Sequence, residues 1–149
     1  MSVLTLVENW EGEFKKTSFE AVSYGKKIAK KIDQQLTVLT IGDTNLESLK
    51  NYGADIILNI KSIDFETTTN IEIAKICADV IKEQNINTII ISNTNTGKSI
   101  APLIASILDA GLLSNAIDYP EKNMPLVVNC KAFSGKAYAK YESNYQKNI

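Results

Sequence analysis

Residues 88–99 read TIIISNTNTGKS, an apolar run followed by a polar loop that leads into a second apolar segment. The run 88–91 is short, continuous and rich in isoleucine, which is typical of a strand buried on both faces. Apolar residues recur at helical spacing after Gly97, so we expect a helix from about 98 to 109. A strand followed directly by a helix is the repeating unit of a parallel α/β sheet.

The same alternation extends from this unit toward both ends of the chain. The pattern predicts further strands at 2–7, 36–41 and 55–60, and helices at 17–31, 45–51 and 69–84. Three helix starts carry a Thr and a Glu at the spacing of a capping box: Thr17 with Glu20, Thr44 with Glu47, and Thr69 with Glu72.

The region after residue 109 departs from this alternation. A strand is expected at 115–118, and residues 126–131 and 132–141 are predicted to form two adjacent strands. Residues 133–137 fit either a bulged strand or the turn between those strands. Because crossovers between parallel strands are right-handed, we predict an open, mostly parallel, doubly wound three-layer α/β sandwich, Rossmann-like and similar to adenine nucleotide hydrolases, with an antiparallel strand pair near the C-terminus.

Residues 92–99, SNTNTGKS, differ by one position from the P-loop that grips nucleotide phosphates, because Ser92 stands where its first glycine would be. In a P-loop the backbone N–H groups surround the phosphates, the lysine reaches the outer phosphates, and the next hydroxyl holds the metal. Thr96, Gly97, Lys98 and Ser99 are therefore candidate nucleotide-loop residues. The alternative is a polar strand-to-helix turn. A hydrolase is disfavoured because no later strand ends in a metal-binding aspartate.

Ligands of open parallel sheets bind beyond the carboxyl ends of the strands. Three predicted loops emerge there, at residues 8–10, 42–44 and 93–97. Asp43 is accordingly a further nucleotide candidate, although we prefer to interpret it as a helix-start residue that favours the helix dipole. A stand-alone adenine-nucleotide-binding module is the alternative function that these loops support.

Composition excludes several other classes. At 149 residues and 44% hydrophobic content, the chain is expected to form one domain, 1–149, and its net charge of −1 gives no electrostatic case for nucleic acid or anionic lipid. It has no histidine, and all 16 cations are lysine, so we expect no catalytic residues and no metal site.

Cys77 and Cys130 are expected to be buried free thiols. No stretch resembles a signal peptide or a membrane span, and we expect a cytoplasmic bacterial protein.

Taken together, the segments resemble the N-terminal domain of the electron transfer flavoprotein alpha subunit. The similar stretches are the first strand, WEGEFKK (10–16), SFEA (18–21), LKNYGAD (49–55), TGKSIAP (96–102) followed by Ala105, Leu108 and Gly111, and FSGKA (133–137). The resemblance covers essentially the whole chain. In this family the loop glycine is commonly followed by a basic residue and then an acid, where this chain has Lys98 and Ser99, so the likeness to a P-loop would be accidental.

The resemblance implies a function for the complete subunit. FAD would be held by a separate C-terminal domain, which is not present in these 149 residues, so we expect no cofactor in this chain. Electrons would pass from acyl-CoA dehydrogenases, as in fatty acid β-oxidation, through FAD to a membrane quinone reductase. The domain itself would be a scaffold that packs against the beta subunit, a similar fold that often holds AMP.

Aromatic side chains are the candidate contacts with that partner. For Trp10, an interface contact and packing on its own hairpin are left open. Tyr138, Tyr141 and Tyr145 are interface candidates too, but we expect Tyr138 to be an ordinary half-buried strand residue.

Overall fold

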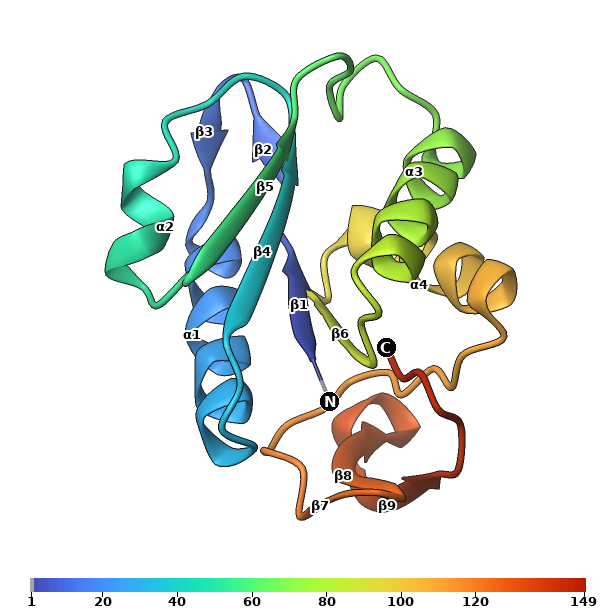
Figure 1. The fold of residues 1–149 in the computed structure, drawn as a ribbon. Coiled ribbons are helices and arrows are strands. Elements are labelled where there is room, and N and C mark those ends of the chain that lie inside the picture. The colour runs from blue at the N-terminus through green and yellow to red at the C-terminus, as the bar shows by residue number, and fades with distance from the viewer. Residues whose placement is uncertain (1) are drawn as a thin grey trace.

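The computed structural model describes residues 2–149. Its body is the parallel sheet that was predicted, and its four strands lie in the order β5-β4-β1-β6 (Figure 1). The strands are β1 (Val3–Leu6), β4 (Leu36–Ile41), β5 (Ile56–Ile60) and β6 (Thr88–Ile91). The chain moves outward from β1 to β5 and then returns to β6 on the other side of β1, so the direction of winding reverses between β1 and β6.

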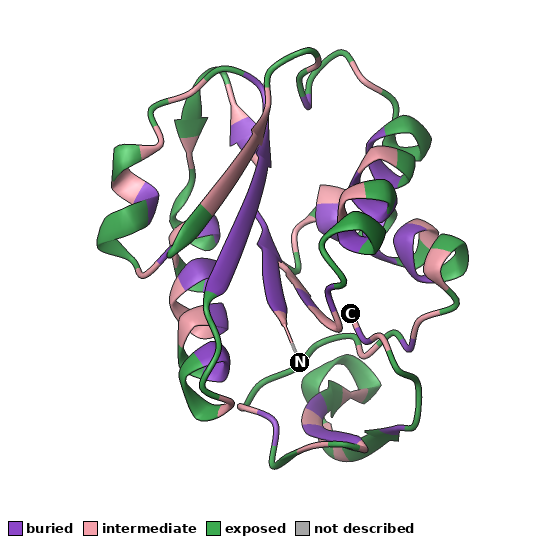
Figure 2. Ribbon diagram, viewed as in Figure 1, coloured by how far each residue is buried: buried purple, intermediate pink, exposed green. Residues whose placement is uncertain are grey.

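Helices cover both faces of this sheet. The helices α1 (Lys16–Lys31) and α2 (Glu47–Asn51) pack on one face, and α3 (Asn70–Glu83) and α4 (Asn95–Leu108) pack on the other (Figure 1). Residues of β1 alternate between the two resulting cores, with Leu4 and Leu6 in one and Val3 in the other. Strands β1 and β4 are buried along their whole length (Figure 2). The predicted three-layer α/β fold is confirmed.

Two smaller antiparallel sheets flank the body. A hairpin of β2 (Asn9–Trp10) and β3 (Glu13–Phe14) follows β1 directly. Near the C-terminus, β7 (Lys122–Asn123), β8 (Leu126–Ala132) and β9 (Ala137–Ser143) form a three-stranded sheet. The short 3₁₀ turn η1 (Phe133–Gly135) joins β8 to β9, so residues 133–136 form the turn rather than a bulged strand, and Ala137 begins β9.

The strand predicted at 115–118 is wrong. Within the described residues, this segment makes a single antiparallel bridge, between Ala116 and Cys130. It runs along the margin of the small sheet, and its backbone is held by bonds from Ile117 to Asn129 and from Lys131 to Asn115. The segment lies on the side of β8 that pairs with β7, and only Ala116 reaches a ladder position there, so it does not extend into a strand.

One of the three predicted capping boxes is confirmed. The Thr69 side chain accepts the Glu72 N–H, and the Glu72 carboxylate accepts the Thr69 N–H, at the start of α3. The boxes at Thr17 and Thr44 are wrong. Thr17 lies inside the first turn of α1, whose N-cap is Lys15, and the Thr44 hydroxyl donates instead to the Gly12 carbonyl of the β2–β3 hairpin.

Candidate functional site

The crevice expected to bind a ligand lies between the carboxyl ends of β1 and β6, where the winding reverses. Its centre is taken by the side chain of Glu8, the second residue after β1. The Thr94 hydroxyl, which follows β6, donates to one Glu8 oxygen, and Trp10 Nε1 donates to the other at 3.1 Å. The crevice is therefore closed by a carboxylate and its own hydrogen-bond donors.

The loop that resembles a P-loop is the first turn of α4. Thr94 is the N-cap and accepts the Gly97 N–H at 2.9 Å, while the Lys98 N–H donates to the Thr94 carbonyl. The Ser99 hydroxyl donates to the Asn95 carbonyl at 3.0 Å. Several of the groups that hold a nucleotide in a P-loop thus have partners within the helix, whereas the Lys98 side chain is exposed.

Gly97 has a structural role at this position. A Cβ atom there would overlap the Ser92 carbonyl oxygen and lie 3.1 Å from Cγ2 of Ile91. Its absence lets the first turn of α4 pack directly on the end of β6. Close packing of a helix on its preceding strand therefore accounts for the glycine.

Asp43 and the 96–99 turn do not come together. Asp43 follows β4, and β1 separates β4 from β6. The Asp43 carboxylate is exposed, with Lys61 at 3.9 Å. It is not a helix-start residue either, because α2 begins only at Glu47.

A residue that sequence reasoning passed over, Asn9, ties the loops at this edge together. Its buried side-chain amide donates to the Ile41 and Asp43 carbonyls, each at 3.2 Å. A polar amide in the loop that follows a buried strand was the signal that could have identified it.

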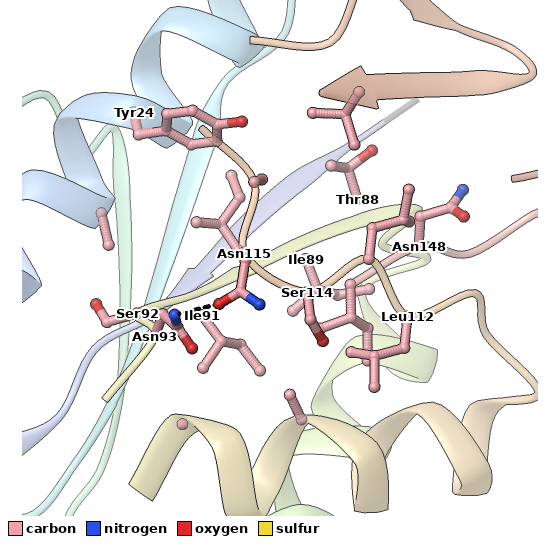
Figure 3. A pocket seen from close by; sticks show the side chains of 18 of the residues that line it. Tyr24, Thr88, Ile89, Ile91, Ser92, Asn93, Leu112, Ser114, Asn115 and Asn148 are labelled. Atoms are coloured by element: carbon pink, nitrogen blue, oxygen red, sulfur yellow. Dashed lines mark hydrogen bonds between the residues drawn. The ribbon is translucent and has the colours of Figure 1, made fainter. Parts of the chain in front are cut away.

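A groove of about 690 Å³ runs along the outer edge of β6 (Figure 3). Its walls come from α1, α4 and residues 112–116, and most of the lining is apolar. Lys98 lies at its margin. At one end, Asn93 Nδ2 donates to Asn115 Oδ1 at 2.7 Å. The groove itself was not predicted, although Gly97 and Lys98 of the predicted nucleotide loop belong to its lining.

One wall of the groove is fixed by Tyr24 of α1. Its hydroxyl donates to the Asp118 carbonyl at 2.7 Å, and its ring stacks on Tyr119 with centroids 4.9 Å apart. Burial, together with the neighbouring Tyr119 and Asp118, raises the pKa of Tyr24 to about 12. The phenol therefore stays neutral at ordinary pH and remains a hydrogen-bond donor.

The predicted buried free thiols are confirmed. Cys77 lies in the core under α3, and Cys130 lies in β8. Burial raises the pKa of Cys77 to about 12 and raises that of Cys130 as well, so both stay protonated.

Neither a metal cluster nor a membrane-spanning helix was found in the part of the chain that the structure describes. Residues 2–149 contain no group of three His, Cys, Asp or Glu side chains placed to hold a metal ion. The same residues include no helix both long and apolar enough to cross a bilayer.

The aromatic interface candidates differ in exposure. Trp10 is partly buried against Phe65, with ring centroids 6.4 Å apart. The prediction for Tyr138 is wrong, because this side chain is 70% exposed. It projects from the small sheet, away from the face that packs on the body, near the exposed Phe133 of the hairpin turn.

Comparison with known families identifies the family to which this architecture belongs. A model described as "Electron transfer flavoprotein domain" matches residues 3–148. The chain belongs to the electron transfer flavoprotein family. Because the match extends over nearly the whole chain, the parallel sheet, the crevice and the small sheet all lie within the family's domain.

Individual relatives agree with this assignment. The electron transfer flavoprotein subunit alpha of Bacillus subtilis is 31% identical over 140 residues, which are 91% of this chain and 42% of that protein. Protein FixB of Clostridium saccharobutylicum is 30% identical over 142 residues, 92% of this chain and 42% of that protein. The acryloyl-CoA reductase electron transfer subunit beta of Anaerotignum propionicum is 30% identical over 111 residues, covering 72% of this chain and 30% of the relative. The resemblance to the alpha-subunit N-terminal domain is confirmed, and the chain spans about two fifths of the length of its first two relatives.

The family name implies a flavin, and the crevice offers a test of whether this domain suits one. A dinucleotide needs free N–H groups and no opposing charge around its pyrophosphate. Here the pyrophosphate would meet the Glu8 carboxylate, and the Gly97 N–H already donates to Thr94. The crevice of this electron transfer flavoprotein domain does not fit FAD.

Proposed function

We propose that this chain is the scaffold domain of an electron transfer flavoprotein alpha subunit, without catalytic residues of its own. It packs against the beta subunit, and FAD is bound outside residues 1–149. The complete complex carries electrons from acyl-CoA-type dehydrogenases through FAD to a quinone reductase. The observation that carries the proposal is the family match over residues 3–148, together with a crevice that a carboxylate already occupies.

The small sheet offers a surface for the beta subunit. Phe133 is 82% exposed at the hairpin turn, and Tyr138, 70% exposed, follows on β9 close to that turn. Large exposed aromatic side chains are favoured as interface anchors because they bury much area at little entropic cost. We name the surface formed by Phe133 and Tyr138 the hairpin patch.

Association with the beta subunit tests this proposal. Purified beta subunit of an electron transfer flavoprotein is expected to bind the chain, as measured by calorimetric titration. The double variant Phe133→Ser/Tyr138→Ser should weaken binding at least tenfold, about 1.4 kcal/mol, because it removes two anchors. Ile71→Ser is the matched control, since Ile71 is exposed on α3 outside the patch and should leave the affinity unchanged. If no salt condition gives association, the scaffold assignment is wrong.

Adenine-nucleotide binding is the second candidate function. The observation that favours it is that Lys98, Gly97 and Ser92 all border the groove beside β6. Under this alternative, Thr96 and Ser99 would complete the contacts of the loop, whereas Asp43 follows β4, two strands away from β6, and would not take part.

Calorimetric titration with AMP and ATP, with and without magnesium, distinguishes this candidate. If the loop binds nucleotide, Lys98→Ala should weaken the affinity at least tenfold, because the lysine is the cation nearest the loop. Lys75→Ala, on α3, is the charge-matched control. Affinity that is unchanged by Lys98→Ala would exclude this loop as the nucleotide site.

A further inference from the structure

Strand β5 forms one margin of the parallel sheet, and its outer edge is open. On its inner side it pairs with β4, from Ile56 opposite Thr37 to Ile60 opposite Ile41. Across residues 2–149, no strand pairs with its other side. Figure 2 shows the contrast, since β4 is buried along its whole length whereas β5 is only partly buried, and Ile56 is 41% exposed. The backbone edge of β5 is therefore accessible to another chain.

This edge lacks the features that usually keep edge strands apart. Natural edge strands carry a lysine, a proline or a bulge that prevents pairing with a second chain. The sequence of β5, IILNI, contains neither lysine nor proline, and its register with β4 runs without a bulge. Charged residues stand directly outside the strand, with Asp55 before it and Lys61 after it. The strand is thus a mostly apolar edge with a charge of opposite sign at each end.

The hydrogen bonds to β4 decide which backbone groups of β5 point outward. The Gly42 N–H donates to the Ile60 carbonyl at 2.8 Å, so the backbone groups of Ile60 face β4. In a parallel strand this direction alternates from one residue to the next. The backbone groups of Leu58 therefore face β4 as well, whereas the N–H and C=O groups of Ile57 and Asn59 point away from the sheet. Among residues 2–149, no backbone group pairs with these outward groups.

One antiparallel register makes the outward groups complementary to those of a second copy. With Leu58 placed opposite Leu58 of that copy, Ile57 lies opposite Asn59, and Asn59 lies opposite Ile57. Each of these pairs directs its N–H and C=O groups at the other strand, as the hydrogen-bonded pairs of an antiparallel ladder require. The Leu58 pair then takes the non-hydrogen-bonded position between them. The backbone phase of β5 therefore fits a twofold axis at Leu58.

The same register also matches the side chains. It places Ile56 opposite Ile60 and Asp55 opposite Lys61 of the second copy. Opposite charges directly across two strands are favourable, whereas like charges are not. The Lys61 side chain can reach across, because its contact with Asp43 is long, at 3.9 Å, and exposed. Shifting the register by two residues keeps the hydrogen bonds in phase but loses this charge pair.

We propose that two copies of this chain join along β5, antiparallel and around a twofold axis at Leu58, so that the two four-stranded sheets become one continuous sheet. Pairing of the same edge from both copies is the geometry of a closed dimer. A strand of five residues extends about 17 Å, so the contact is small and the dimer is weak and concentration-dependent. The inference goes beyond the proposed function and does not rest on it, because the hairpin patch belongs to the small sheet.

Disulfide trapping tests the register. Ile56 and Ile60 form a non-hydrogen-bonded pair in this dimer, with Cα atoms about 4.5 Å apart, a separation that a disulfide can span. Chains carrying Ile56→Cys and Ile60→Cys should therefore crosslink on mild oxidation when mixed, about tenfold faster than either chain alone. The parent chain is the control for Cys77 and Cys130, which are buried.

Sedimentation equilibrium measures the association itself. Between roughly 10 µM and 1 mM, the mass of the parent chain is expected to rise from that of one copy toward that of two. Lys61→Asp should weaken the dimer about fivefold, because it places two carboxylates opposite each other at both ends of the contact. Lys75→Asp, exposed on α3, makes the same change of charge away from β5 and should leave the association unchanged.

The contrary outcomes are equally definite. A monomer mass over the whole concentration range overturns the proposal, and so does a dimer that Lys61→Asp and Lys75→Asp affect equally. Crosslinking of Ile56→Cys with itself as fast as with Ile60→Cys would require a different register and also overturns it. Excess beta subunit of an electron transfer flavoprotein should leave the crosslink in place. Loss of the crosslink would assign the edge to the beta subunit and reject the second copy as its occupant.

Discussion

At the residue scale, the sequence feature most suggestive of chemistry turns out to support packing. Gly97 was singled out as part of a phosphate loop, but in the structure it is where α4 touches the end of β6. A glycine in the first turn of a helix fits both roles, because each needs a position without a Cβ. The neighbouring strand, which distinguishes between the roles, is known only once the chain is folded.

Replacing Gly97 with alanine tests this packing role. The added Cβ meets the Ser92 carbonyl, which is backbone and cannot rotate away, so α4 has to shift. We expect Gly97→Ala to lower the free energy of unfolding by about 1–3 kcal/mol, measured by urea denaturation. Ser99→Ala, in the same turn but exposed, should change it by less than about 0.5 kcal/mol. An unchanged or higher stability of Gly97→Ala would show that the turn does not need the glycine.

Glu8 is a second residue whose role depends on the fold. It follows β1, across the crevice from Gly97. Nothing in its local sequence marks it as special, since a glutamate at the end of a strand is normally solvated. Its carboxylate is fixed because two side chains donate hydrogen bonds to it. Trp10 is close to Glu8 in the sequence, whereas Thr94 is far from it and follows β6. The charge that makes the crevice unsuitable for a pyrophosphate therefore depends on tertiary contact.

At the scale of elements, the run LKNYGAD that carried the family resemblance has a clear structural purpose. Lys26 of α1 donates to both oxygens of Asp55, at 2.5 and 2.6 Å, and the Leu36 N–H of β4 donates to Asp55 at 2.7 Å. Gly53, with φ of 109°, leaves room for the stem of Lys26. One carboxylate thus connects α1, the start of β4 and the entry to β5.

The ionisation of Asp55 gives a pH-dependent prediction. Burial alone would raise its pKa, but the hydrogen bonds from Lys26 and from the Leu36 N–H outweigh burial and hold the pKa of Asp55 below its usual value. A lowered pKa means that the ionised form stabilises the fold. This stability is fully present above the unfolded pKa, about 3.9, and is lost as the pH falls through the folded pKa.

Asp55→Asn should therefore cost about 1 kcal/mol at neutral pH, a value reduced for the partial exposure of the pair. The difference in free energy of unfolding between the variant and the parent chain should shrink as the pH drops below about 4. Asp55 is then protonated and carries no charge, like the asparagine that replaces it. Urea denaturation over a pH series measures it. Glu47→Gln is the control, since its pair with Lys50 is exposed and should matter little. A difference that stays constant down to low pH would contradict the role of the carboxylate charge.

At the scale of the whole molecule, the body and the small sheet meet through few connections. They include the stack of Tyr24 on Tyr119, the pairing of residues 147–149 with Asn87, Ile89 and Gly111, and the Ser143–Asn148 hydrogen bond. The two cysteines report on the two parts separately, because Cys77 lies in the body and Cys130 in the small sheet.

Thiol labelling should detect a difference in stability between these parts. With few connections to the body, the small sheet is expected to open locally at a lower free energy than the core under α3. In urea below the unfolding midpoint, Cys130 should react with a thiol reagent at least tenfold faster than Cys77. The single-cysteine variants Cys77→Ala and Cys130→Ala allow each rate to be measured alone. Equal rates would mean that body and small sheet open as one unit.

The sequence by itself determined the three-layer fold, the strands of the body and the capping box at Thr69, because these depend on apolar periodicity and on residues close together in the chain. The family resemblance could also be recognised from the sequence alone, because it rests on short local stretches such as LKNYGAD. The sequence did not determine that Thr44 bonds the hairpin, that Glu8 fills the crevice, or that Asn148 joins the edge of β6. Each of these contacts joins segments more than 30 residues apart. Only the tertiary structure decides them, because a hydrogen bond needs both partners in place and local sequence specifies only one of them.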